Sequence, residues 1–231
     1  MPTVTTTLTS QFAAFNPYQP DTAAVYSEPI HASASSRAKR FIDILGAIVG
    51  LGITAMIAIP VAIASCISDP GGIFYSQVRC GYKGKPFRIW KFRSMVRDAD
   101  QKKHLVQNQA SGFIFKNEND PRITRIGRFL RRTSLDELPQ FWNVLKGDMS
   151  LVGTRPPTPD EVARYNPHHW RRLDVKPGLT GEWQVNGRST VKNFEDIVDM
   201  DIQYQDKWSV TYDIQLILKT ILVVLKGSGA C

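Results

Sequence analysis

The chain has 231 residues, with 29 Lys and Arg against 21 Asp and Glu, which gives a net charge of +8 at pH 7. Charged residues make up 22% and hydrophobic residues 42%, as in globular proteins, so the chain is neither a purely disordered protein nor a multi-span transporter. The three cysteines show no C-x-x-C spacing, which excludes a small disulfide-stapled domain, makes a zinc site unexpected and fits a reducing compartment.

Residues 1–36 contain no Lys or Arg and are rich in Thr, Ser, Ala and Pro. They lack the basic start and the short apolar stretch of a signal peptide. Too few of them are apolar to offset the entropy of ordering, so we predict a disordered tail over 1–36.

Residues 44–67 form an apolar run without any Asp, Glu, Lys, Arg or His. As a straight helix the run would measure roughly 36 Å, which exceeds the roughly 30 Å of a bilayer core. A buried helix of a soluble core is the weaker interpretation, because such helices seldom run so long without charge. Gly46 and Gly50 have the GxxxG spacing that lets another helix pack closely.

Two features of this run favour a re-entrant helix over a spanning one. Pro60 removes a helical hydrogen bond and is expected to kink or break the helix. Basic residues flank both ends, and a spanning helix would put one group outside the cytoplasm, against the preference of Lys and Arg. These residues are Arg37, Lys39 and Arg40 before the run, and Arg79, Lys83 and Lys85 after it. We therefore expect a re-entrant membrane helix over 37–69, with a spanning helix as the alternative.

A turn signal at 68–72 precedes two expected strands, 73–79 and 86–93, which would form a hairpin around 81–84. Lys and Arg are in excess over 79–103 and are interleaved with aromatic residues. This mixture is typical of nucleic-acid binding or of contact with an anionic membrane. Beside a membrane helix the second interpretation is favoured, so no nucleic-acid partner is expected.

Asp120, followed by Pro121, predicts the start of a helix that is apolar on one side and basic on the other. Such a helix suits a membrane interface, although an ordinary solvated face has the same pattern. The apolar residues are Ile123, Ile126 and Leu130, and the basic ones are Arg122, Arg125, Arg128 and Arg132. A further helix over 214–225 is expected to pack on a core or to lie in the interface.

The stretch 134–147 predicts a helix that begins with two adjacent carboxylates. Ser134 and Glu137 have capping-box spacing, and Gly147 is the expected C-cap. An apolar stripe follows, made of Leu138, Phe141, Trp142 and Leu145. Asp136 and Glu137 would then stand at the positive end of an amphipathic, buried helix.

Carboxylates at a helix start are most often caps and nothing more. Here, however, Arg131 and Arg132 lie just upstream and Arg155 follows in the segment 153–157. A helix N-terminus attracts phosphate, and an ionised carboxylate there is a competent nucleophile or ligand for a hard metal. Carboxylates beside arginines near a membrane therefore indicate phosphoryl transfer.

Two other positions carry chemistry-bearing side chains. Asp201 falls on the apolar stripe of a predicted helix, so it needs a partner there, either an arginine or a metal. Thr158 and Glu161 form a second capping box, which we interpret as structural.

These residues lie in blocks that resemble the bacterial sugar transferases, also called monotopic phosphoglycosyl transferases. The resemblance is specific, because the blocks occur in order over about residues 38–230. The matching blocks are 39–43 (KRFID), 91–95 (KFRSM), 120–128 (DPRITRIGR), 133–140 (TSLDELPQ), 147–150 (GDMS), 177–181 (PGLTG) and 184–188 (QVNGR).

The resemblance implies an α+β, mostly helical fold, with a compact cytoplasmic catalytic domain over 70–231, a re-entrant membrane helix and interfacial amphipathic helices. It implies that Asp136 attacks the β-phosphate of a UDP-sugar and releases UMP. Polyprenol phosphate, usually undecaprenyl phosphate, would then accept the phospho-sugar. Glu137 would hold Mg²⁺, with Asp201 at a second acidic position assigned to the metal.

By the same resemblance, Arg155, Arg132 and Arg188 would bind substrate phosphate. The enzyme would act at the cytoplasmic face of the bacterial inner membrane and start an exopolysaccharide or related glycan. A homodimer is left open. Two positions depart from the family pattern, namely Thr154 and Ile59, where Pro and Ser are usual. The alternative from another class is a non-catalytic basic adaptor that binds anionic lipid or nucleic acid.

Overall fold

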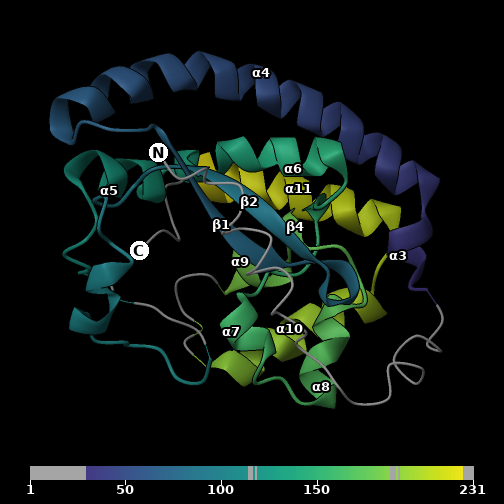
Figure 1. The fold of residues 1–231 in the computed structure, drawn as a ribbon. Helices are drawn as coiled ribbons and strands as arrows, with labels where there is room; N and C mark the ends of the chain where they lie inside the picture. Colours follow the sequence, from purple (N-terminus) through teal and green to yellow (C-terminus); the bar gives the residue numbers. More distant parts are fainter. Residues whose placement is uncertain (1–29, 114–116, 118, 188–190, 192, 226–231) are drawn as a thin grey trace, which may run out of the picture.

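A 32-residue helix, α4 (Arg37–Ser68), runs along one side of the protein in the computed structural model (Figure 1). The structure describes residues 30–113, 117, 119–187, 191 and 193–225. Within these residues the other helices are α3 (Ala32–Ser35), α5 (Arg125–Arg132), α6 (Phe141–Lys146), α7 (Pro159–Val162), α8 (Pro167–Trp170), α9 (Glu182–Asn186), α10 (Phe194–Asp206) and α11 (Val210–Leu225). The same residues include the short 3₁₀ helices η1 (Tyr82–Gly84), η2 (Gln101–Leu105), η3 (Leu135–Gln140) and η4 (Arg171–Leu173). The fold is thus mostly helical with some sheet, as expected.

Helix α4 continues through Pro60, so the break expected at this proline is not found. A proline inside a helix removes one hydrogen bond and crowds the preceding turn, and this bends a helix without having to end it. Figure 1 shows α4 as one helix that bows over the rest of the protein. By length and composition α4 could cross a membrane.

The N-terminal half of α4 is fixed to the domain by buried polar side chains. The Lys39 ammonium lies 2.6 Å from a carboxylate oxygen of Asp213 on α11. The Asp43 carboxylate accepts hydrogen bonds from the Ser150 hydroxyl at 2.8 Å and from the Leu151 amide at 2.9 Å. Because isolated buried charges are costly, these contacts determine how α4 lies on the domain.

Gly46 and Gly50 of α4 pack against side chains of the domain that follows α4 in this chain. A Cβ atom on Gly46 would lie 2.5 Å from the Leu151 side chain, and one on Gly50 would lie 2.4 Å from the Phe141 ring. The GxxxG spacing therefore serves close packing within this chain, where any larger residue would push the helix away.

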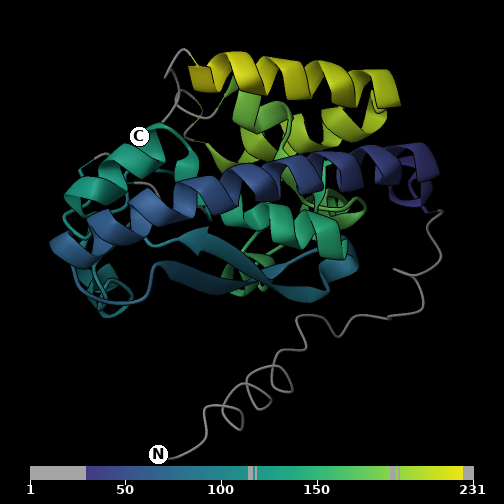
Figure 2. The ribbon, with the colours of Figure 1, turned by 90° about the horizontal axis from the view of Figure 1, so that it is seen from above.

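The predicted hairpin is confirmed within about one residue at each end. Strands β1 (Phe74–Cys80) and β2 (Pro86–Phe92) pair antiparallel, with Tyr75 opposite Lys91 and Arg79 opposite Phe87. A second, parallel pair joins β3 (Ser150–Val152) to β4 (Gly178–Thr180). Seen from above, α4 runs between α11 on one side and the hairpin on the other (Figure 2).

The main core lies between α4, the hairpin, α6, β3 and α11. Its buried members are Ala47, Phe87, Ile89, Val144, Met149, Leu151, Val152, Val175, Tyr204 and Leu216. Because Ala47 belongs to this cluster, the apolar helix is part of the core and is not an appendage to it.

The predicted start of a helix at Asp120 is wrong. Helix α5 begins at Arg125, with the Thr124 hydroxyl accepting from the Gly127 amide as the N-cap. The Asp120 carboxylate instead binds the Arg122 guanidinium at 2.6 Å, and both residues are buried. Arg122 therefore does not join the exposed basic side of α5.

The capping box predicted at Ser134 is also absent. Ser134 adopts a left-handed conformation (φ 57°) without a side-chain cap, and residues 135–140 form the 3₁₀ helix η3 before α6. Gly147 is confirmed as the C-cap, with φ 89°. Helix α6 lies between α4 and the hairpin, which buries Asn143 and Val144 and leaves Trp142 of the predicted stripe exposed.

Two segment boundaries in the structure also differ from the predicted ones. Residues 30–36, included in the predicted tail, are described, and His31 caps α3 and contacts the Gln205 carbonyl oxygen at 3.1 Å. Residues 1–29 lie outside the described part of the chain. The last helix begins at Val210, four residues earlier than predicted, and Leu218 and Ile221 on it are exposed.

Candidate active site

Asp136 and Glu137 lie on η3 and face cations from two other elements. Asp136 is buried, with 5% of its surface exposed. The Lys91 ammonium on β2 lies 2.7 Å from a Glu137 carboxylate oxygen. Arg131, on the last turn of α5, donates from Nε to the Ser94 hydroxyl at 2.9 Å. Burial lowers the pKa of Arg131, and the negative charge of Asp136 acts in the opposite direction.

The left-handed Ser134 positions these groups. It joins α5 directly to η3, so the arginine at the end of one helix and the carboxylates at the start of the next are only a few residues apart. Non-glycine residues seldom adopt this conformation, and such residues cluster at functional sites. The backbone outlier therefore supports a chemical role for the adjacent pair.

Arg155 is held by the second capping box. Its guanidinium donates to both carboxylate oxygens of Glu161, at 3.0 and 3.4 Å. Glu161 also closes the capping box with Thr158, as predicted, so this box orients Arg155 in addition to starting α7. Burial tends to raise the pKa of Glu161, but Arg155 and further donors outweigh it, and the pKa lies below its ordinary value.

The loop that carries Arg155 (residues 153–157, the Arg155 loop) is positioned by close backbone contacts between Gly153 and the segment 177–181. A Cβ atom on Gly178 would lie 2.1 Å from the Gly153 amide nitrogen, and one on Gly181 would lie 2.1 Å from the Gly153 carbonyl oxygen. Only glycine fits such approaches. Thr154, where the family usually has proline, donates from its hydroxyl to the Arg172 carbonyl at 3.0 Å, so the turn is supported by a side-chain hydrogen bond.

Arg132 and Asp201, two further predicted site residues, occupy different positions in the structure. Arg132 is exposed on α5, whereas its neighbour Arg131 faces inward. Asp201 is buried with 1% exposure and lies 2.6 Å from the Arg172 guanidinium, so its partner in the structure is an arginine. Arg188 lies outside the described residues. The roles proposed for these three residues stay predictions.

The sequence alone did not single out Lys91 as a site residue, and of the neighbouring Arg131 and Arg132 it assigned a phosphate-binding role only to Arg132. Lys91 lies within the KFRSM block, and Arg131 directly precedes Arg132. The block could therefore have pointed to Lys91, and the pair of adjacent arginines could have pointed to Arg131. Across the residues that the structure describes, no group of three or more His, Cys, Asp and Glu side chains is placed to hold a metal. A metal bound at the pair would therefore take at most these two carboxylates from the part of the chain that the structure describes.

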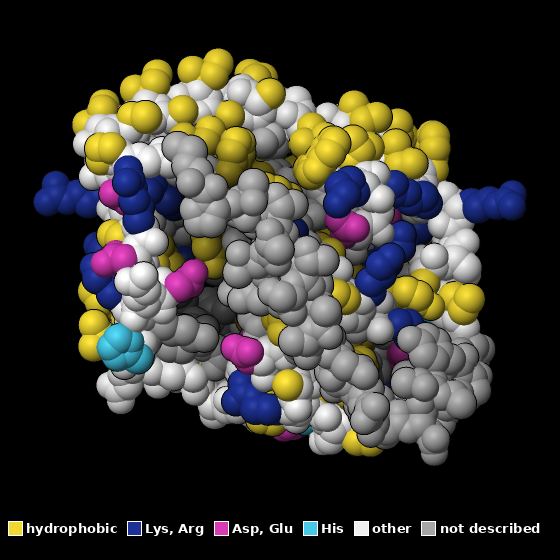
Figure 3. Space-filling model, viewed as in Figure 1, with side chains coloured by type: hydrophobic (Ala, Val, Ile, Leu, Met, Phe, Trp, Pro, Cys, Tyr) yellow, Lys and Arg dark blue, Asp and Glu magenta, His cyan; other side chains and the backbone are white. Residues whose placement is uncertain are grey.

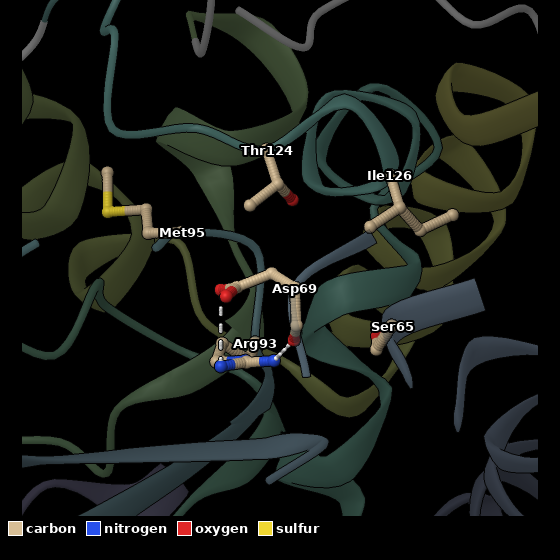
Figure 4. Close-up of a pocket in the computed structure, with 6 residues that line it drawn as sticks. All are labelled: Ser65, Asp69, Arg93, Met95, Thr124 and Ile126. Carbon is tan, nitrogen blue, oxygen red and sulfur yellow. Dashed lines mark hydrogen bonds and ion pairs between the residues drawn. The ribbon is translucent and has the colours of Figure 1, made fainter. Parts of the chain in front are cut away.

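A shallow recess lies at the C-terminal end of α4 (Figure 4). Asp69 forms an ion pair there with Arg93, with 3.3 Å between the charged groups, which ties the end of α4 to the chain after β2. The recess is lined by Ser65, Asp69, Arg93, Met95, Thr124 and Ile126. None of the predicted site residues lines it, so we assign it a structural role.

An exposed apolar surface covers the outer sides of α4 and α11 and includes one residue each of α5 and α6. Figure 3 shows hydrophobic side chains along the top of the protein, with Lys and Arg side chains gathered below them at both sides. Soluble proteins rarely expose so many large apolar residues together, and an apolar face above basic residues is typical of a membrane-bound protein. Its members include Phe41, Leu45, Ile48, Val49, Ile53, Met56, Ile59, Ile63, Ile67, Phe129, Trp142, Ile214, Leu218, Ile221, Leu222 and Val224.

Three relatives from different bacteria illustrate how this chain compares with known proteins. It is 53% identical over 207 residues to a galactosyl transferase, CpsE, of Streptococcus agalactiae serotype III (strain NEM316), covering 89% of this chain and 46% of that protein. It is 41% identical over 191 residues to the UDP-glucose:undecaprenyl-phosphate glucose-1-phosphate transferase of Escherichia coli (strain K12), covering 79% of this chain and 39% of that protein. The exopolysaccharide production protein ExoY of Rhizobium meliloti (strain 1021) is 36% identical over 199 residues, which is 84% of this chain and 88% of that protein.

The chain thus spans less than half the length of the first two relatives and most of the third. Residues 34–227 also match the model of the bacterial sugar transferases. This range contains α4, the carboxylate pair and the Arg155 loop. Because the match covers most of the sequence, the chain belongs to the bacterial sugar transferase family.

Proposed function

We propose that the protein transfers a phospho-sugar from a UDP-sugar to polyprenol phosphate and thereby starts an exopolysaccharide or related glycan. The observation that supports this most directly is the buried Asp136 next to Glu137, with Arg131 and Lys91 facing the pair. The names of the relatives from E. coli and R. meliloti support the donor, acceptor and product classes.

In the proposed first step, a carboxylate oxygen of Asp136 attacks the β-phosphorus of the UDP-sugar. The bond from that phosphorus to the bridging oxygen breaks, and its electron pair stays on the oxygen, which leaves as part of UMP. Arg131 would offset the negative charge that gathers at the phosphoryl group, since its charge lies close to Asp136. The sugar phosphate is then held as an aspartyl phosphate.

In the second step, a phosphate oxygen of the polyprenol phosphate attacks the same phosphorus. The bond to Asp136 breaks, the carboxylate is restored, and a polyprenol diphosphate sugar leaves. The acceptor is a lipid, so its phosphate must reach η3 from the apolar surface. The location of η3 supports this route, because the Leu138 carbonyl on η3 accepts a hydrogen bond from the Thr54 hydroxyl of α4 at 3.1 Å.

We assign Mg²⁺ to the same pair. Magnesium prefers oxygen ligands and is often bound by one or two carboxylates together with substrate phosphates, which two adjacent carboxylates of this kind fit. Glu137 would hold the ion, and its side chain is 26% exposed and thus open to solvent. When bound, the ion would neutralise charge on the diphosphate.

We further propose that α4 lies within one leaflet and that the domain sits on the cytoplasmic face. Helix α4 is bound to the same domain near its start through Lys39 and just beyond its end through Asp69. A spanning helix would draw the polar groups packed along it into the hydrocarbon core, where they are costly. The basic side chains below the apolar surface in Figure 3 suit anionic lipid headgroups.

UMP release tests the catalytic proposal. Purified protein in nanodiscs is given a panel of UDP-sugars with Mg²⁺ and undecaprenyl phosphate, and UMP is measured with and without a chelator. We expect UMP only with the preferred sugar and only with metal. A non-catalytic membrane adaptor would release none with any sugar.

Cysteine labelling tests the topology. Single cysteines are placed at Arg37 and Gly72 in a variant lacking Cys66, Cys80 and Cys231, and intact inner-membrane vesicles of each orientation are labelled with an impermeant maleimide. We expect both positions to react from the cytoplasmic side. Reaction from opposite sides would overturn the one-leaflet arrangement.

A further inference from the structure

Arg79 lies near the end of β1, close to the candidate active site. Among the described residues, its guanidinium donates hydrogen bonds only to neutral groups. Its Nε and Nη2 atoms donate to the Gln77 side-chain oxygen at 3.1 and 2.8 Å, and Nη1 donates to the Pro156 carbonyl at 3.0 Å. A guanidinium has five N–H groups. Two of them therefore have no partner among the described residues.

The fold brings Arg79 beside Arg155. The Cys80 amide donates to the Pro157 carbonyl at 2.9 Å, which fixes the end of β1 to the loop that carries Arg155. Glu161 is ion-paired with Arg155. Burial, followed by the charge of Arg155, lowers the pKa of Arg79 to about 10, although the charge of Glu161 acts in the opposite direction. An anionic ligand would compensate this excess positive charge.

Arg79 shares one face of the hairpin with Lys91. Side chains alternate along a strand, so Tyr75 and Arg79 lie on the same face, and Tyr75 is paired with Lys91. Four residues of strand place Tyr75 and Arg79 roughly 13 Å apart. One face of the hairpin thus carries both Arg79 and the cation that binds Glu137.

Arg79 lies near the turn end of the hairpin, beside the segment that leads into α7. The Cys80 amide is hydrogen-bonded to the Pro157 carbonyl, two residues before α7, and in Figure 1 α7 is on the opposite side of the hairpin from α4. The donor's nucleotide is water-soluble, whereas the polyprenol phosphate arrives from the apolar surface. A phosphate held beside the segment before α7 therefore fits the nucleotide better than the lipid.

We propose that Arg79 is a further phosphate-binding residue, which together with Arg155 holds the nucleotide phosphate that leaves in the first step. This inference rests on the proposed function. When the bond between the β-phosphorus and the bridging oxygen breaks, negative charge develops on the oxygen that UMP retains. A guanidinium with free N–H groups stabilises that charge and so speeds departure of the nucleotide.

The test compares Arg79→Gln and Arg79→Lys with Arg88→Gln. Arg88 is a matched control, because it lies on the opposite face of the same hairpin and donates to the Ser76 hydroxyl at 2.8 Å. The rate of UMP release in the first turnover, inhibition by added UMP, the KM for undecaprenyl phosphate and the thermal midpoint are measured for each variant.

We expect Arg79→Gln to slow UMP release by about 10²-fold and to weaken UMP inhibition by a similar factor, with the KM for undecaprenyl phosphate unchanged. Arg79→Lys should recover part of both losses, since it restores the charge. Arg88→Gln should match the parent protein in all of these measurements.

Three outcomes would overturn the assignment. Equal behaviour of Arg79→Gln and Arg88→Gln would show that Arg79 binds no phosphate. A raised KM for undecaprenyl phosphate with normal UMP inhibition would place Arg79 at the lipid phosphate. A lowered thermal midpoint with equal losses in the Gln and Lys variants would show a structural role. Calorimetric binding of UMP to Asp136→Asn, with and without Arg79→Gln, tests the site even if the parent protein releases no UMP.

Discussion

Asp136 and Asp201 are both buried carboxylates that face arginines, but they stand in different kinds of structure. Asp201 lies on the regular helix α10, whose Ile197, Val198 and Ile202 are buried in a hydrophobic cluster, and it is 2.6 Å from the buried Arg172. Asp136 lies on a 3₁₀ helix directly after the left-handed Ser134, beside Glu137. The comparison shows that burial alone does not identify a reactive carboxylate. A buried ion pair in a regular helix favours a structural role, whereas irregular backbone beside several cations favours a chemical one.

The largest effect is expected at Asp136. Replacing it with Asn removes the nucleophile while keeping the shape, so transfer should fall by at least about 10³-fold, with the thermal midpoint nearly unchanged. Both are measured on the same nanodisc sample, by UMP release and by a thermal melt. Full activity in this variant would mean that another residue attacks the phosphorus.

Asp201→Asn should show the reverse pattern. It leaves the Arg172 charge buried without its counter-ion, which should destabilise the fold by roughly 3–5 kcal/mol, while the activity of the folded fraction persists. Denaturant melts and activity per folded molecule separate the two effects. The double variant Asp201→Leu, Arg172→Met should regain much of the stability, because it removes both charges together. Loss of Mg²⁺ dependence with normal stability would instead support Asp201 as a metal ligand.

Substitutions of the neighbouring Arg131 and Arg132 should change the transfer rate less than the loss of Asp136, but by clearly different amounts. Arg131→Gln should reduce transfer roughly tenfold, because its charge acts on Asp136, whereas Arg132→Gln on the exposed side should change it less than about twofold. The two rates of UMP release are compared at saturating UDP-sugar. A larger loss for Arg132 would restore the assignment made from the sequence.

The smallest effect concerns the pH dependence of stability at Glu161. Its pKa is lowered in the folded protein, so its ion pair with Arg155 stabilises the fold above the ordinary carboxyl pKa of about 4.5, and this contribution is lost as the pH falls through the folded value. The parent protein should therefore be more stable than Glu161→Gln at pH 7, with the difference shrinking toward pH 3. Thermal midpoints across this range measure it, and a constant difference would contradict the assignment.

Local features were predictable where the responsible residues are adjacent in sequence. The hairpin strands follow from short apolar and aromatic runs around glycines, and the C-cap at Gly147 needs only a glycine after a helix. The apolar character of α4 follows from composition. The carboxylate pair was found because Asp136 and Glu137 are neighbours.

Features that depend on packing were not predictable. A change of one position rotates a helical residue by about 100°, so the choice between Arg131 and Arg132 depends on how α5 packs. That packing is set by Gly127, where a Cβ atom would lie 1.8 Å from the Ser94 carbonyl oxygen. The salt bridge from Lys91 to Glu137 likewise joins residues far apart in the chain, which no local pattern reveals.

The contribution of α4 to the core has a consequence for biogenesis. Helix α4 precedes the hairpin, η3 and β3 in the chain, so it leaves the ribosome before the segments that pack on it. An apolar helix that emerges first can enter the bilayer while the rest is still being made. If α4 enters the bilayer in this way, as the proposed function requires, we expect the carboxylate pair and its cations to assemble on a helix already held in lipid, with the membrane surface as the template on which the domain completes its fold.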